Sequence, residues 1–201
     1  MSFVPGPSRE IERRSSTALW VLLCAFVLAL PLAEAPKNIA AGLCMLLWGL
    51  RAVWTRDFGG PWDRFDTAFA LMLGSAALSG WAGGYAGDFS GVVRVLGVAW
   101  VAKRIVLSPN QRLGVMACAC LGLAVSLAVA ALPFFRGTSK FLELPSVGHV
   151  NQSALYIAVL ACATLGWSLQ RLGRGSRWYA AVVASAILFG LALFVSGSRA
   201  A

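Results

Sequence analysis

The stretch that decides the fold is 113–133, which reads LGVMACACLGLAVSLAVAALP and carries no charged residue. A helix needs about 20 apolar residues to cross the ~30 Å hydrocarbon core of a membrane. Further apolar runs lie before and after this stretch, at 17–33, 38–53, 67–82, 89–102, 152–169 and 178–195. The segments between the runs are too short to hold a soluble domain. The pattern therefore predicts an all-α, polytopic membrane bundle of about seven transmembrane helices, with an eighth beginning at the end of the sequence.

The composition agrees with this class. Of the 201 residues, 59% are hydrophobic and only 12% are charged, whereas soluble domains are roughly half apolar and a quarter charged. The mean hydropathy is +0.75. These values exclude a disordered chain, a collagen-like chain and an ordinary soluble enzyme. The net charge of +9 lies in short loops rather than in a basic domain, so we expect no nucleic-acid partner.

The basic residues predict the orientation of the chain, because cytoplasmic loops of membrane proteins are enriched in Lys and Arg. We place residues 1–16 in the cytoplasm and assign 17–201 to the transmembrane domain. Twelve of the 17 bases then fall in four cytoplasmic segments, three in each: Arg9, Arg13, Arg14; Arg51, Arg56, Arg64; Lys103, Arg104, Arg112; Arg171, Arg174, Arg177. Four bases fall on the outer side, namely Lys37, Arg136, Lys140 and Arg199, and Arg94 lies within a run. A cleaved signal peptide, ending near Ala33-Glu34-Ala35, is an alternative interpretation of the first run.

The longest predicted outer loop holds several candidate functional residues. It covers 134–151, reads FFRGTSKFLELPSVGHVN, and includes Arg136 and the single histidine, His149. A histidine can act as a general base or as a hydrogen-bond donor, although a lone histidine at a helix start is more often a local hydrogen-bond partner. Asn151 follows, and its residue type favours the N-cap of the sixth helix.

Two arginines are candidates for binding an anion. Arg199 follows Ser196-Gly197-Ser198, which is typical of a turn and cap before a new helix. A guanidinium group matches phosphate oxygens, and a helix N-terminus adds backbone donors. Arg94 lies inside the fourth run, where a charge usually faces a cavity or a partner; a pair with Asp88, or snorkelling to the surface, would also account for it. An ordinary interfacial anchor is the alternative for Arg199.

Two short stretches together resemble a known family. GHVNQSALY at 148–156 opens a helix after an outer loop, and SGSRAA at 196–201 ends the next outward crossing. In order, spacing and outward placement they are similar to the H-x-N and S-R-A/G-A elements of the O-antigen ligase / O-antigen polymerase superfamily of bacterial inner-membrane proteins. Beyond these elements the resemblance is one of hydropathy pattern.

The resemblance implies a metal-independent glycosyltransferase without a cofactor, acting on the periplasmic face of the inner membrane. Its donor would be a glycan on undecaprenyl pyrophosphate, and a ligase would pass that glycan to the lipid A-core of lipopolysaccharide. The arginine of the S-R-A/G-A element, here Arg199, would bind the donor pyrophosphate. The candidate substrate-binding residues are Arg94, Arg136, His149, Asn151, Ser198 and Arg199.

The family pattern also leads us to expect a longer protein. Members have about a dozen spans, and a large periplasmic loop after this region supplies a further arginine and the histidine credited with catalysis. We therefore expect this chain to be an N-terminal part that is inactive alone, with its catalytic residues beyond residue 201. His149 precedes the S-R-A/G-A element, so it does not correspond to that histidine.

Several alternatives remain open at this point. A polymerase or a protein O-oligosaccharyltransferase of the same superfamily would use the same donor with another acceptor. A transporter half would line an anion path with Arg94 and Arg199 and would form no glycosidic bond. A non-catalytic scaffold would only touch anionic membrane lipids with its basic loops.

Overall fold

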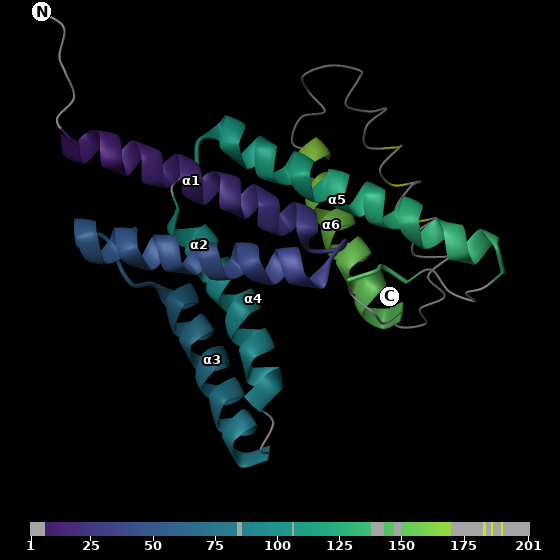
Figure 1. Cartoon of the computed structure of the whole chain (residues 1–201), viewed down its shortest axis with the longest axis horizontal. Helices are drawn as coiled ribbons and strands as arrows, with labels where there is room; N and C mark the ends of the chain where they lie inside the picture. The colour runs from purple at the N-terminus through teal and green to yellow at the C-terminus, as the bar shows by residue number, and fades with distance from the viewer. Residues whose placement is uncertain are drawn as a thin grey trace, which may run out of the picture. The chain divides into compact units, whose positions relative to one another are not determined.

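The computed structural model describes residues 7–83, 86–105, 107–137, 143–146 and 150–169, together with Val183, Ala186 and Gly190. Within these residues the chain is helical and has no β-strand (Figure 1). The helices are α1 (Pro7–Ala29), α2 (Glu34–Thr55), α3 (Arg64–Gly83), α4 (Ala86–Arg104), α5 (Pro109–Phe135) and α6 (Val150–Leu169). The predicted all-α class is confirmed.

The helices follow the apolar runs closely. Each run from the second to the sixth lies wholly inside one helix, α2 to α6 in order. The seventh run, 178–195, lies outside the described residues except for Val183, Ala186 and Gly190, which are helical.

The first run was predicted too long at its end. Helix α1 ends at Ala29, and Pro31 explains why: proline lacks an N–H group and disfavours helical geometry in the residue before it. A tight turn follows, in which the N–H groups of Leu32 and Ala33 both donate to the Ala29 carbonyl at 3.0 Å. Helix α2 therefore starts only a few residues later, at Glu34.

Two of the described helices are long and apolar enough to cross a membrane, judged by length and composition. They are α2 and the Pro109–Pro133 part of α5. Helices α1 and α6 contain shorter apolar stretches, Arg14–Ala29 and Ser153–Trp167. The number of seven spans stays a prediction.

The chain divides into two compact units, and the first comprises Met1–Phe26 and Ala35–Val115. Within it, α3 and α4 lie side by side (Figure 1). Its core lies where α1, α2 and α4 pack together, and it is built from Leu19, Leu23, Ala41, Cys44, Val98, Val101 and Ile105. Trp20 adds a polar tie, because its indole N–H donates to the Gln111 carbonyl at 3.0 Å.

The second unit comprises Val27–Glu34 and Met116–Ala201. Its described core joins α5 and α6 to the short segment 143–146, through Ala119, Leu123, Leu144, Ile157, Leu160 and Ala161. Gly122 on α5 lies directly against the Leu28 backbone at the end of α1, where an added Cβ would collide with the Leu28 carbonyl oxygen. The two backbones can approach this closely only because residue 122 has no side chain.

Candidate functional site

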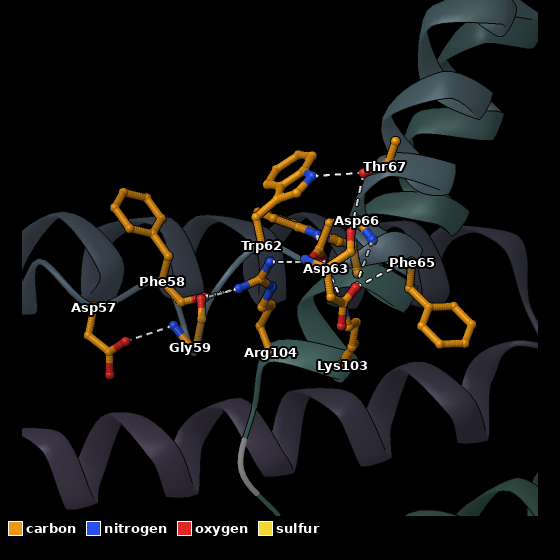
Figure 2. A network of polar contacts seen from close by, with 12 residues as sticks. Asp57, Phe58, Gly59, Trp62, Asp63, Phe65, Asp66, Thr67, Lys103 and Arg104 are labelled. Atoms are coloured by element: carbon orange, nitrogen blue, oxygen red, sulfur yellow. Dashed lines mark hydrogen bonds and ion pairs between the residues drawn. The ribbon is translucent and has the colours of Figure 1, made fainter.

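The most elaborate polar site among the described residues joins the start of α3 to the end of α4. We call Asp63, Asp66, Lys103 and Arg104 the charge cluster; Figure 2 shows their side chains directed toward one another. Part of the site is formed by residues close in the sequence, because Asp63 and Asp66 form a reciprocal capping box at the start of α3. The Asp63 carboxylate accepts from the Phe65 and Asp66 N–H groups at 2.9 and 3.1 Å, and the Asp66 carboxylate accepts from the Asp63 N–H at 2.8 Å.

Asp66 is the centre of the charge cluster. Its side chain is fully buried, at 0% exposure. One carboxylate oxygen accepts from the Trp100 indole N–H at 2.7 Å and pairs with the Lys103 ammonium at 2.9 Å. The other accepts the Asp63 N–H at 2.8 Å and pairs with the Arg104 guanidinium at 2.5 Å. Each oxygen thus meets two donors, which is what a buried carboxylate requires to stay ionised.

Arg104 ties the loop before α3 to the end of α4. Besides Asp66, its guanidinium donates to the Gly60 carbonyl at 2.6 Å and to the Phe58 carbonyl at 3.5 Å. The loop can reach the arginine because Gly59, at φ +79°, lies against the Arg104 carbonyl oxygen, where a side chain would collide. Gly59 is held there from the other side by the Asp57 carboxylate, which accepts its N–H at 2.8 Å.

Aromatic side chains cover the charge cluster. The Arg104 guanidinium lies over the Trp100 ring at 5.3 Å, and the Lys103 ammonium lies over the Phe65 ring at 5.8 Å. Trp48 on α2 meets Trp100 edge to face, with ring centroids 4.8 Å apart. A cation over the face of an aromatic ring is attracted by the ring, so both contacts favour the charged forms of Lys103 and Arg104.

The charge cluster shifts the pKa of its members in opposite directions. Burial alone would raise the pKa of Asp66, but the hydrogen bonds from Arg104 and Lys103 outweigh it and hold this pKa below its usual range. The hydrogen bond from Lys103 likewise lowers the pKa of Asp63. Desolvation opposes the charge on Lys103, yet its hydrogen bonds to Asp63 and Asp66 raise its pKa. All three groups are therefore charged at neutral pH.

These shifts predict how stability depends on pH. A lowered carboxylate pKa stabilises the fold above the unfolded value of 3.8 and loses that contribution as the pH falls below it. A raised lysine pKa stabilises the fold below 10.5 and loses its contribution above that value. We expect the thermal unfolding midpoint of the detergent-purified protein to fall at both limits. In Asp66→Asn, the unfolding midpoint should fall less as the pH is lowered. An unchanged acid dependence in that variant would contradict the assignment of the acid-sensitive stability to Asp66.

The arrangement is suited to holding structure rather than to a reaction. Every Asp66 oxygen is already occupied, so this carboxylate has no free lone pair with which to take a proton from a substrate. The Arg104 Nε atom is buried without a hydrogen-bond partner, but the rest of its guanidinium is engaged. Among the described residues, no three His, Cys, Asp or Glu side chains group closely enough to hold a metal ion.

The structure places only some of the sequence-predicted site residues. Arg94 lies half-buried on α4 in the first unit, and Arg136 is exposed just after α5 in the second unit. Asn151 is the second residue of α6, so the expectation that it caps this helix is wrong: the helix already begins at Val150. Nothing is described of the Asn151 and Asp88 side chains, and His149, Ser198 and Arg199 lie outside the described residues.

A second polar site, in the second unit, lies inside the GHVNQSALY stretch. Ser153 is fully buried on α6, and its hydroxyl oxygen accepts the Leu144 N–H at 3.0 Å. The Pro31 carbonyl accepts both the buried Ser126 hydroxyl at 2.8 Å and the Ser146 N–H at 3.4 Å. Segment 143–146 is thereby fixed to α6 and to the turn after α1. Residue type alone did not single out Ser153, because a serine in an apolar helix carries no signal of a distant partner.

Comparison with known proteins adds no family to this description. No family model matches the chain, and neither a curated protein nor a solved structure is similar to it.

Proposed function

We propose that this chain is a polytopic protein of a bacterial inner membrane, with its N-terminus in the cytoplasm. The apolar surface of its helices supports this proposal. The side chains of Val53, Trp54 and Trp81 are 76%, 80% and 85% exposed. In α2 and α5, only 22% and 28% of the apolar segment that is long enough to cross a membrane is buried within the protein. A core helix of a soluble protein would bury most of such an apolar segment. In water, exposed apolar faces of this size would drive the protein to associate.

The charge cluster is compatible with this topology. Its four members lie at the start of α3 and the end of α4, where the positive-inside rule puts the cytoplasmic interface. Asp63 and Asp66 neutralise Lys103 and Arg104, so these two basic side chains at the end of α4 meet the membrane boundary as ion pairs.

We further propose that the chain is the donor-binding part of an O-antigen ligase-like glycosyltransferase. The observation that carries this is the pair of stretches GHVNQSALY and SGSRAA, in this order and on the predicted periplasmic side. In the proposed reaction the bond between the anomeric carbon and the pyrophosphate oxygen breaks, and a new bond forms to a hydroxyl of the lipid A-core. The hydroxyl proton passes to a base, and undecaprenyl pyrophosphate leaves.

Arg199 has a defined part in this proposal. The leaving pyrophosphate gains negative charge in the transition state, and a guanidinium placed against it stabilises that charge more than it stabilises the bound donor. Removing such a group typically costs about 10²–10³-fold in rate. Ser198 and the backbone N–H groups that follow would add neutral donors.

We expect Arg199→Ala, made in the complete protein in its native membrane, to reduce glycan transfer by about 10²-fold or more while insertion persists. Transfer of radiolabelled glycan to lipid A-core is the measurement. Arg199→Lys should recover part of the activity, because it restores charge but not the planar fork. Lys37→Ala, which changes an outer-side base outside both stretches, is the control. Wild-type transfer by Arg199→Ala would overturn the assignment, and glycan movement without new glycosidic bonds would favour the transporter.

A further inference from the structure

A shallow pocket lies on the first unit between α1 and α2. Ser15 contributes from α1, and the lining residues from α2 are Leu47, Leu50, Arg51, Trp54 and Thr55. The spacing of these α2 residues places them on one helix face. The pocket has a volume of about 160 Å³ and is lined almost entirely by apolar atoms. It is smaller than the ~300–1,000 Å³ sites that enclose small molecules, so it suits a segment of a longer apolar chain.

The residues around this pocket are both apolar and basic toward the end of α2. Leu50 and Trp54 offer carbon surface that is 60% and 80% exposed. Arg51 lies between them in the sequence, and the exposed Arg56 follows the end of the helix at Thr55. An apolar surface thus meets basic groups within two helical turns. None of the described residues that line the pocket is acidic.

We propose that this pocket binds an anionic phospholipid of the cytoplasmic leaflet, with an acyl chain against Leu50 and Trp54 and the phosphate at Arg51. Tryptophan and arginine at a helix end are suited to the level of the lipid headgroups. The site does not require Arg51 to be otherwise unbound, because a guanidinium has five N–H donors and can share them between ligands. The proposal rests on the membrane placement above and is independent of the transferase activity.

The lining selects among possible ligands. Arg51 and the exposed Arg56 place two positive charges beside the pocket, so a headgroup with net negative charge is preferred to a zwitterionic one. A soluble phosphate lacks the chain that would fill the apolar pocket, and its binding would be weaker by the lost hydrophobic contact. The ligand is therefore a lipid with net negative charge.

The experiment uses the full chain in phosphatidylcholine vesicles that contain a few per cent of phosphatidylglycerol brominated on its acyl chains. Bromine quenches tryptophan fluorescence at short range, and the difference between the wild type and Trp54→Phe isolates the Trp54 signal. We expect this signal to be quenched more by brominated phosphatidylglycerol than by brominated phosphatidylcholine at equal content. Trp81 is equally exposed but lies outside the pocket, so Trp81→Phe should leave the excess quenching unchanged.

A second variant tests the headgroup contact. Arg51→Gln should weaken phosphatidylglycerol binding about fivefold, since one basic residue near the surface is worth roughly a factor of this size. Arg64→Gln, an exposed arginine on the same predicted side but outside the pocket, should have little effect. Glycerol 3-phosphate should not compete. Equal quenching by both lipids, equal losses in the two arginine variants, or full competition by glycerol 3-phosphate would each overturn the proposal.

Discussion

Replacing Asp66 by alanine is expected to give the largest loss of stability of any single change in the first unit. The substitution removes the acceptor of four donors at once, and it leaves Lys103 and Arg104 beside each other without their shared counter-charge. Breaking one side of a buried ion pair is far more costly than never having made the pair, because the remaining charge stays desolvated. We expect the variant to lose most of its folded, detergent-extractable protein, or to unfold many degrees lower.

The matched control is Asp57→Ala, because Asp57 is an exposed aspartate in the neighbouring loop whose carboxylate accepts only the Gly59 N–H among the hydrogen bonds described. It should lower the unfolding midpoint slightly. Arg104→Gln should act on the same interactions as Asp66→Ala, so the double variant should be much less destabilised than the two single losses together predict. Strict additivity, or an Asp66→Ala variant as stable as Asp57→Ala, would contradict the central place of Asp66.

The helices could be predicted from the sequence because their signal is local. Runs of apolar residues of the right length specify helical spans, and the tight turn after α1 was missed only because Pro31 lies inside an apolar run. The charge cluster was harder to foresee. Lys103 and Arg104 were interpreted through the orientation rule alone, as cytoplasmic bases, although both have specific partners on α3.

One signal could have found half of the charge cluster. Asp63 precedes Asp66 by three residues at the start of an apolar run, and this spacing is a helix-capping pattern that can be recognised in the sequence. The other half depends on how α3 and α4 pack, which brings residues 34 to 40 positions apart into contact. No periodicity in the sequence specifies that register.

The candidate reaction site, unlike the charge cluster, was proposed from the sequence alone. The resemblance assigned a role to Arg199 from two short stretches. Within the described residues of those stretches, the structure adds a contact of Ser153, whose hydroxyl holds segment 143–146 through Leu144. That contact joins positions 9 residues apart across a turn. The Ser126 hydroxyl donates to the Pro31 carbonyl, which lies 95 positions earlier in the sequence. The sequence alone could not predict this hydrogen bond, because it depends on how the helices pack.

Gly122→Ala is expected to give the largest effect of any small substitution in the second unit. The new Cβ would occupy the space of the Leu28 carbonyl oxygen, and both neighbours of the contact are backbone, so no flexible side chain can move aside. The two helix segments must separate, and this also loosens the nearby core contacts of Leu123 with Ile157 and Leu160. Overpacking of this kind typically costs about 1–3 kcal/mol, which a shift in the thermal unfolding midpoint would reveal.

Gly166→Ala provides the comparison, because Gly166 lies on α6 of the same unit and an added Cβ there meets no atom within 4 Å. That change should leave stability unchanged or raise it by up to about 1 kcal/mol, since alanine is the better helix former. The two variants differ from the wild type by the same single methyl group, so the difference between them measures the close approach at Gly122 alone. Equal midpoints would mean that α1 and α5 do not pack backbone to backbone at this position.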